Sequence, residues 1–158
     1  MNTTPLPNTP VDKREHCVSV CNSLLRGEIS AVETYGMVIE KFSEEPEVGI
    51  LERIRSEHEQ AAFQLRNRLI EMQALPETSS GAWGAIVKTV QGTANLFGEE
   101  SAVKSLQQGE EIGRGAYENA LEDVNVLPEC KNLIRGRLLP MVTNHTDRLE
   151  SIGKVIGQ

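Results

Sequence analysis

Residues 23–39 read SLLRGEISAVETYGMVI, and residues 105–121 read SLQQGEEIGRGAYENAL. Both contain Ser-Leu-x-x-Gly-Glu-x6-Tyr, so the second segment repeats the first 82 residues later in the chain. Each copy places a glutamate, Glu28 or Glu110, where the helical pattern calls for an apolar residue. The repeat predicts a duplicated helix pair, and it marks the interior of that pair as the place for chemistry.

Apolar residues recur at intervals of three and four along four segments, which predicts four long amphipathic helices. The first follows Asp12-x-x-Glu15, a capping-box pattern, and extends to Phe42. The second begins near Pro46 and is stopped by Pro76, the third ends near Val124, and the fourth begins at Pro128. Each predicted helix carries one apolar stripe, a row of residues on one face. In chain order the four stripes are Val18, Cys21, Leu25, Val32, Ile39 and Phe42; Leu51, Ile54, Ala61, Leu65 and Met72; Val103, Leu106, Tyr117, Ala120 and Val124; and Ile134, Leu138, Met141, Leu149, Ile152 and Ile156.

Lengths of about 25 to 35 residues favour a bundle, and the short link at 43–45 makes the first two helices antiparallel. Between Glu77 and Gly98 the chain is rich in Ser, Gly, Ala and Thr around Trp83, which predicts a long crossover with a short helix. We expect an all-α, antiparallel four-helix bundle over residues 12–158 and a disordered, proline-rich tail over residues 1–11. Pro140 should kink the last helix about one turn before His145.

The charge and composition exclude several classes of protein. A net charge of -7 without a basic cluster is unlike a nucleic-acid binder, and no apolar run reaches the roughly 20 residues of a membrane span. The three cysteines are an odd number, and the first ten residues lack the features of a signal peptide. These observations predict a cytoplasmic protein with no nucleic-acid or membrane partner.

One titratable residue falls on each predicted apolar stripe: Glu28, His58, Glu110 and His145, in helix order. A buried carboxylate must be neutralised, because leaving it unpaired costs several kcal/mol. Two interpretations stay open. The four residues could form a hydrogen-bonded polar layer, with Arg55 or Arg66 reaching Glu28 and with Tyr35 and Tyr117 as donors, or they could bind a metal.

The repeated Gly-Glu-x6-Tyr segments resemble the first and third helices of the ferritin-like superfamily, which includes rubrerythrins and bacterioferritins. The segment from His145 to Glu150 resembles the part of bacterioferritins that carries the last ligand histidine. The helix lengths and the Trp83 crossover resemble more narrowly the bacterial family called domain of unknown function 2383. The resemblance covers residues 13–157 and implies a ferritin-like bundle with a long crossover between its two hairpins.

By this resemblance, Glu28 and Glu110 match the single-glutamate positions of a di-iron site, and His145 matches its last histidine. Position 142, where the motif needs a glutamate, is Val142, and the second helix lacks a Glu-x-x-His motif. Two bridging carboxylates are therefore missing, and the di-iron site is degenerate. A smaller site for one Fe or Zn ion would use Glu28, Glu110 and His145, with Tyr35 and Tyr117 as hydrogen-bond donors to the ligands. His58 is the fourth candidate ligand and the weakest, because it should lie about one helical turn, roughly 5 to 6 Å, away from Glu28.

The roles of Cys17, Cys21 and Cys130 stay open in the sequence. Cys21 lies on the apolar stripe and is predicted to be a small core residue, and two helical positions four apart disfavour a disulfide between Cys17 and Cys21. Cys130 lies in the first turn of the last predicted helix, where the helix dipole could lower the pKa of its thiol.

Two functional hypotheses follow. The first is a non-enzymatic bundle protein with a degenerate metal site, stress-related by analogy with fold relatives, which acts through a homodimer or a protein partner. The faces that carry Val38 and Ile50 would serve either the crossover or such a dimer. The alternative is an Fe- or Zn-dependent oxidase or iron-handling protein that uses Glu28, Glu110 and His145.

Overall fold

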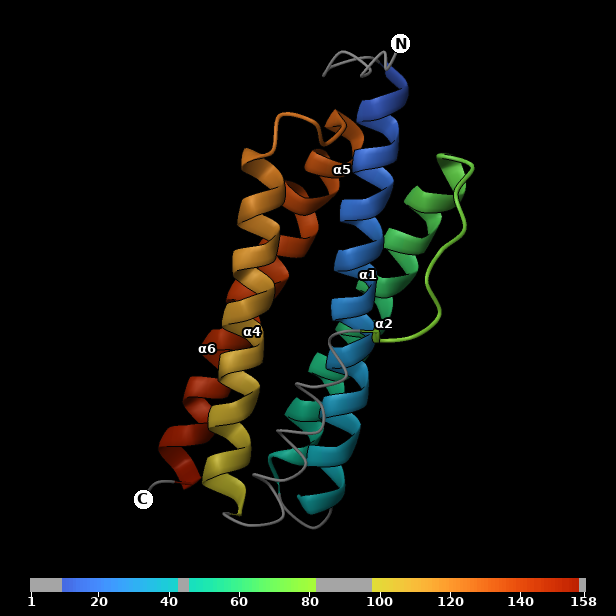
Figure 1. Cartoon of the computed structure of the whole chain (residues 1–158). Helices are drawn as coiled ribbons and strands as arrows, with labels where there is room; N and C mark the ends of the chain where they lie inside the picture. The colour runs from blue at the N-terminus through green and yellow to red at the C-terminus, as the bar shows by residue number, and fades with distance from the viewer. Residues whose placement is uncertain (1–9, 43–45, 82–97, 157–158) are drawn as a thin grey trace.

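The computed structural model describes residues 10–42, 46–81 and 98–156, and within these ranges it is all-helical (Figure 1). The helices are α1 (Pro10–Lys41), α2 (Val48–Glu71), α4 (Glu99–Glu122), α5 (Pro128–Leu133) and α6 (Leu139–Ile156). The segment Ile134–Leu138 joins α5 to α6 as a π-helix, so the three form one continuous C-terminal rod. The prediction of an all-α fold is confirmed.

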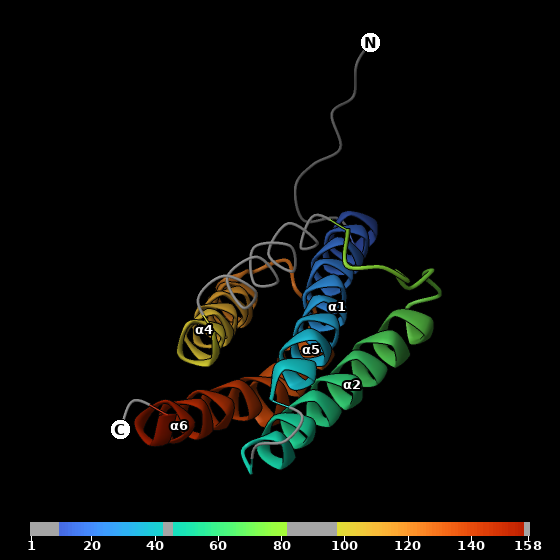
Figure 2. The ribbon, with the colours of Figure 1, turned by 90° about the horizontal axis from the view of Figure 1, so that it is seen from below.

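The helices form two antiparallel hairpins, α1 with α2 and α4 with the C-terminal rod. Helix α1 also packs on α4, and α2 runs in the same direction as α4 (Figure 1). Seen along the helix axes, α6 lies beside α2 and closes the fourth side (Figure 2). The predicted crossover between Glu77 and Gly98 falls mostly on residues 82–97, and the predicted tail falls mostly on residues 1–9; these two ranges lie outside the described residues.

Several predicted helix boundaries are wrong by two to four residues. Helix α1 begins at Pro10, so Asp12 lies inside the helix rather than capping it. Helix α2 begins at Val48 instead of Pro46 and ends at Glu71, well before Pro76. It ends there because Gln73 adopts a left-handed conformation, φ 57°, which lets its own N–H and that of Ala74 bond back to the carbonyls of Ile70 and Leu69.

Buried apolar side chains form two clusters, one at each end of the bundle. The first contains Leu25, Leu65 and Ile134, and the second contains Val38, Leu51 and Ile54. Val38 lies on a face that was expected to serve the crossover or a dimer, but its exposure is 0% because it belongs to the second buried cluster, with Leu51 and Ile54 of α2. Val124 was predicted on the third stripe, yet it is 78% exposed because α4 ends before it.

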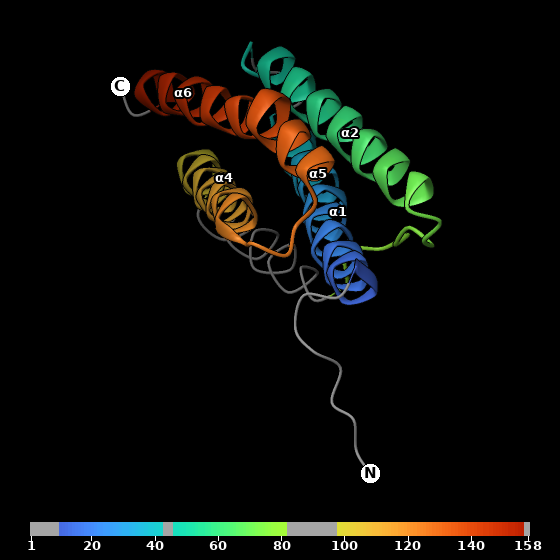
Figure 3. The ribbon, with the colours of Figure 1, turned by 90° about the horizontal axis from the view of Figure 1, so that it is seen from above.

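The C-terminal rod departs from a regular helix where Pro140 was predicted to kink it. The N–H of Leu139 donates to the carbonyl of Ile134, five residues back, as in a π-helix. Proline lacks the N–H that would continue an α-helical ladder, and its ring crowds the carbonyl four residues earlier. The wide turn accommodates this defect, and the rod bends between α5 and α6 (Figure 3).

No helix among the described residues combines the length and apolarity needed to cross a membrane.

Candidate functional site

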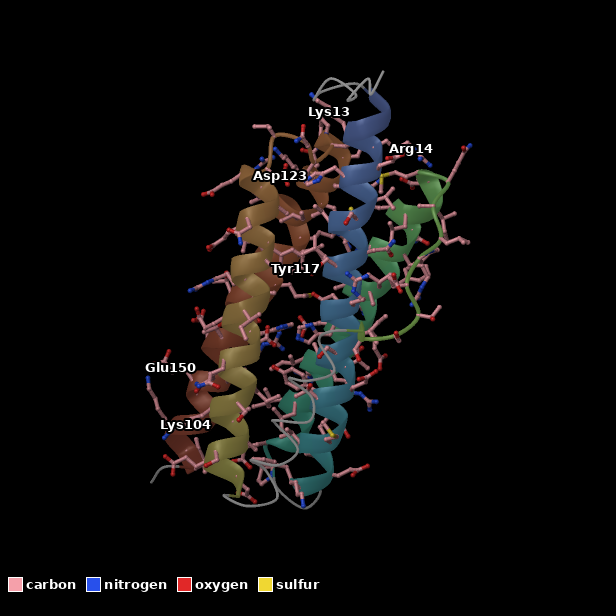
Figure 4. All side chains as sticks on the ribbon, viewed as in Figure 1. Lys13, Arg14, Lys104, Tyr117, Asp123 and Glu150 are labelled. Atoms are coloured by element: carbon pink, nitrogen blue, oxygen red, sulfur yellow. The ribbon has the colours of Figure 1, made fainter. Side chains whose placement is uncertain are left out.

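The two copies of the repeat meet across α1 and α4 and exchange hydrogen bonds. The Tyr35 hydroxyl on α1 donates to Glu110 Oε1 on α4 at 2.6 Å, and the Tyr117 hydroxyl on α4 donates to Glu28 Oε1 on α1. Figure 4 shows Tyr117 between the two helices. The seven-residue spacing, two helical turns, is equal in both copies, so an antiparallel pair brings each tyrosine level with the other copy's glutamate. Burial, and then the neighbouring carboxylate, raise the pKa of both tyrosines well above its usual value, so both remain donors.

His58 on α2 lies between the two glutamates. Its Nδ1 is 2.6 Å from Glu28 Oε2, and its Nε2 is 2.8 Å from Glu110 Oε1. A histidine that donates from both nitrogens is an imidazolium. Burial lowers the pKa of His58, but the two carboxylates outweigh burial and raise it to about 10. Burial by itself would raise the pKa of Glu110. The interactions with His58 and then His145 outweigh burial and hold this pKa well below its usual range.

His145 on α6 completes the group and is fully buried. Its Nδ1 lies 3.4 Å from Glu110 Oε2, and its ring centroid lies 4.6 Å from that of His58. Among the described residues its Nε2 has no hydrogen-bond partner, because the nearest carboxylate oxygen, Glu57 Oε2, is 3.6 Å away. Arg148, one turn along α6, donates to that same oxygen at 2.6 Å. An unpaired buried nitrogen is uncommon in folded proteins and indicates that a further group belongs there.

A cavity of about 60 Å³ lies between α1 and α4 beside this cluster. One water needs only about 15 Å³ measured in this way, so the space holds more than one. The small residues of the repeats make room for it, since Gly27 and Gly109 precede the two glutamates. Its walls also include Val142 and the polar side chains Glu28, Tyr35, His58, Glu110 and Tyr117.

The structure brings all six predicted site residues together: Glu28, Tyr35, His58, Glu110, Tyr117 and His145. His58 contacts Glu28 despite the expected offset of one helical turn, because a glutamate and a histidine side chain together span that distance, about 5.4 Å. His58 also takes the place proposed for Arg55 or Arg66; the guanidinium of Arg55 instead lies against Gly36.

Two further residues of the site, Glu57 and Arg148, escaped the sequence analysis because both lie partly on the surface. The only local signals are that Glu57 precedes His58 and that Arg148 follows His145 by three residues.

The donor set does not fit two metal ions. A di-iron site needs bridging carboxylates, yet position 142 is a buried valine and the core position Ala61 on α2 also lacks a donor. The set does fit one ion. Ligand atoms of His58, Glu110 and His145 lie within 4.8 Å of one another, and all three residues are buried.

Comparisons of the chain with protein-family models, with curated proteins and with solved structures found no match. The resemblance to ferritin-like proteins therefore stays a prediction.

Proposed function

We propose that the protein binds one divalent transition-metal ion, Fe(II) or Zn(II), through His58 Nε2, His145 Nδ1 and a Glu110 carboxylate oxygen. The observation that carries the proposal is that ligand atoms of His58, Glu110 and His145, all three buried, lie within 4.8 Å of one another. Two histidines and one carboxylate are a ligand set for Fe(II) with open positions, and imidazole suits Zn(II) as well.

The surroundings of the two histidines support the same assignment. A metal-binding histidine usually donates its other N–H to a carboxylate, which fixes the orientation of the ring. Glu28 occupies that position behind His58 at 2.6 Å, and Glu57 lies on the corresponding side of His145 at 3.6 Å, beyond hydrogen-bond distance. Glu28 then acts as an orienting carboxylate rather than as the ligand that the sequence suggested.

The charges also favour a single divalent ion. Glu28 and Glu110 together carry two negative charges. The single positive charge of His58 as an imidazolium neutralises only one of them. A divalent ion with neutral histidines balances both, while a second divalent ion would leave a buried excess of positive charge. Bound there, the ion would supply Lewis-acid or redox chemistry beside the cavity.

Metal analysis of the purified protein tests the proposal. Protein from cells supplemented with iron and zinc should contain about one equivalent of metal, and metal added at a hundred times its Kd should stabilise the apoprotein by about 2.7 kcal/mol. His145→Gln and Glu110→Gln should lose the metal. His16→Gln is the matched control, because His16 is the third histidine of the chain and pairs with Asp123 outside the site. Less than about a tenth of an equivalent, with no stabilisation by Fe(II) or Zn(II), would overturn it.

A second candidate is a purely structural polar layer in a non-enzymatic bundle protein. The double hydrogen bond of His58 favours it, since the imidazolium already neutralises much of the buried charge. In that case His145→Leu should raise stability, because replacing an unsatisfied buried polar group by an apolar one removes its desolvation cost. Urea unfolding of His145→Leu beside the wild-type apoprotein measures this difference.

A further inference from the structure

The three cysteines of the chain meet at one buried point near the N-terminal end of α1. Cys17 and Cys21 lie one turn apart on α1, and Cys130 comes from the first turn of α5. Cys17 Sγ is 3.4 Å from Cys130 Sγ, and Cys21 Sγ is 3.2 Å from it. None of the three side chains is more than 4% exposed, and all are free thiols.

The surroundings of the thiols help one of them to ionise. The backbone N–H of Leu127 donates to Cys17 Sγ at 3.5 Å. The hydrogen bond with Cys130 holds the pKa of Cys17 well below its usual range and raises that of Cys21. The positive charge of Arg68 also acts on Cys130, although hydrogen bonding with Cys17 and burial keep the pKa of Cys130 above its usual value. Metal binding would displace the thiol protons, because a cysteine must be deprotonated to act as a ligand.

The spacing of the sulfurs matches a single metal ion. All three lie within 4.8 Å of one another. Sulfur ligands at about 2.3 Å from one ion are about 4 Å apart when three of them surround it in a plane. The contacts of Cys17 and Cys21 with Cys130 would need to open by about 0.6 and about 0.8 Å, which side-chain rotation provides.

We propose that Cys17, Cys21 and Cys130 form a second metal site, an all-sulfur site for a soft, thiol-seeking ion, with Cu(I) as the preferred occupant. Soft thiolate ligands select Cu(I), whereas Zn(II) in a structural site takes four ligands. No fourth histidine, cysteine or carboxylate among the described residues joins this group. Three sulfurs in a dry environment suit a three-coordinate ion better than a tetrahedral one.

A surface hydrogen bond involves the residue next to Cys17 in the chain. His16 precedes Cys17 on α1, its side chain is 44% exposed, and its Nε2 lies 2.5 Å from Asp123 Oδ2. Figure 4 shows Asp123 at the end of α4, facing the start of α1.

Anaerobic titration of the fully reduced protein with Cu(I), in competition with a chromophoric Cu(I) chelator, tests the proposal. We expect one equivalent to bind, with an ultraviolet sulfur-to-metal charge-transfer band and a shell of three sulfur atoms by X-ray absorption. Cys130→Ala and Cys21→Ala should each lose the band and the binding. Glu110→Gln should keep both, so a failure of this site is distinguishable from a failure of the His58, Glu110 and His145 site.

Circular dichroism and thermal melts verify that the variants fold. If a variant does not fold, the X-ray absorption spectrum of the Cu(I)-loaded wild-type protein still shows whether three sulfur atoms bind the ion. Binding by nitrogen or oxygen ligands, or Cu(I) binding that survives Cys130→Ala, would overturn the proposal. So would a Zn(II) complex that outcompetes Cu(I), or a wild-type protein that forms a Cys21–Cys130 disulfide and takes up no Cu(I) after reduction.

Discussion

Each buried glutamate of the site accepts a hydrogen bond from a tyrosine on the opposite helix, and this bond is open to direct test. Tyr117→Phe removes the donor to Glu28 without changing the shape of the ring. Because a buried acceptor then loses a partner, we expect the free energy of unfolding to fall by about 1 to 3 kcal/mol. Urea denaturation monitored by circular dichroism measures the change.

Thr143→Val is the control for that substitution, because the exposed Thr143 hydroxyl bonds only to a helical carbonyl, Leu139 O. Its effect should stay within about 0.5 kcal/mol. Equal effects of Tyr117→Phe and Thr143→Val would mean that Glu28 finds another donor in solution.

His58 should make the stability of the metal-free protein depend on pH. Its pKa is raised from 6.5 to about 10, so its contribution is complete below about pH 6.5 and is lost as the pH rises through about 10. At most the loss is about 5 kcal/mol. Glu110 has a lowered pKa, so its contribution is present above about pH 4.5 and is lost as the pH falls. Urea midpoints of protein treated with chelator should therefore be highest between these limits.

Substitution of His58 isolates its part of this dependence. His58→Gln cannot carry the charge, so the fall in stability above about pH 6.5 should disappear, and stability should be lower at neutral pH. His16→Gln, which alters an exposed histidine, should retain the fall. A wild-type profile that is flat up to about pH 10 would contradict the assigned imidazolium.

At the scale of single residues, the sequence was sufficient to predict the glutamates and tyrosines of the site, because they belong to the repeated segment. Glu28, Tyr35, Glu110 and Tyr117 stand at equal spacing in two similar segments, so one helical register places all four. The contacts of the two histidines depend instead on how far their side chains extend from one helix to another. Whether His58 spans a turn to Glu28 depends on side-chain conformation, which residue counting does not provide.

At the scale of the helices, Gln73 marks a place where the chain can be improved. It ends α2 in the left-handed conformation, φ 57°, which glycine adopts without steric cost. Gln73→Gly should therefore raise the free energy of unfolding by about 1 kcal/mol. Gln64→Gly, in the middle of α2, is the matched control and should lower it by about 1 kcal/mol. A loss of stability with Gln73→Gly would show that the Gln73 side chain contributes more than the backbone strain costs.

The elements were predictable because their apolar periodicity is long, whereas their ends were not. The end of α2 depends on a non-glycine residue in a left-handed conformation, and no sequence rule selects Gln73 for that role. The π-helix is easier to recognise from residue spacing. The buried residues of this part of the rod follow one another at intervals of four: Cys130, Ile134, Leu138 and Val142. Three successive intervals of four exceed the 3.6 residues of an α-helical turn and indicate a wider one.

At the scale of the whole molecule, the polar site separates two apolar clusters that should contribute independently to stability. Ile54→Val in one and Ile134→Val in the other each remove one buried methylene and should cost about 0.5 to 1.5 kcal/mol. The double variant should show the sum within about 0.5 kcal/mol, because the two sites share no contacts. Chemical denaturation of the four proteins tests this, and strong coupling would mean that the site transmits packing changes between the clusters.

The sequence could predict the antiparallel hairpins and the meeting of the two repeats, because both follow from short links and equal spacing. It could not predict the thiol cluster. Cys130 lies 109 residues from Cys21 in the chain, and only the packing of the C-terminal rod on α1 joins them. Contacts of that kind depend on the rotation of one helix against another, which neither composition nor spacing reveals.

The wide turn at Ile134–Leu138 has a consequence for the angular phase of the C-terminal rod. In a uniform α-helix, each residue advances the side-chain direction by about 100°, so Cys130 and Val142 would point about 120° apart. Absorbing one residue in the wide turn reduces that angle to about 20°. The wide turn thus lets a rod that carries one extra residue face inward at both the thiol cluster and the histidine site. A one-codon deletion there would restore a regular α-helix and leave the two sites in phase.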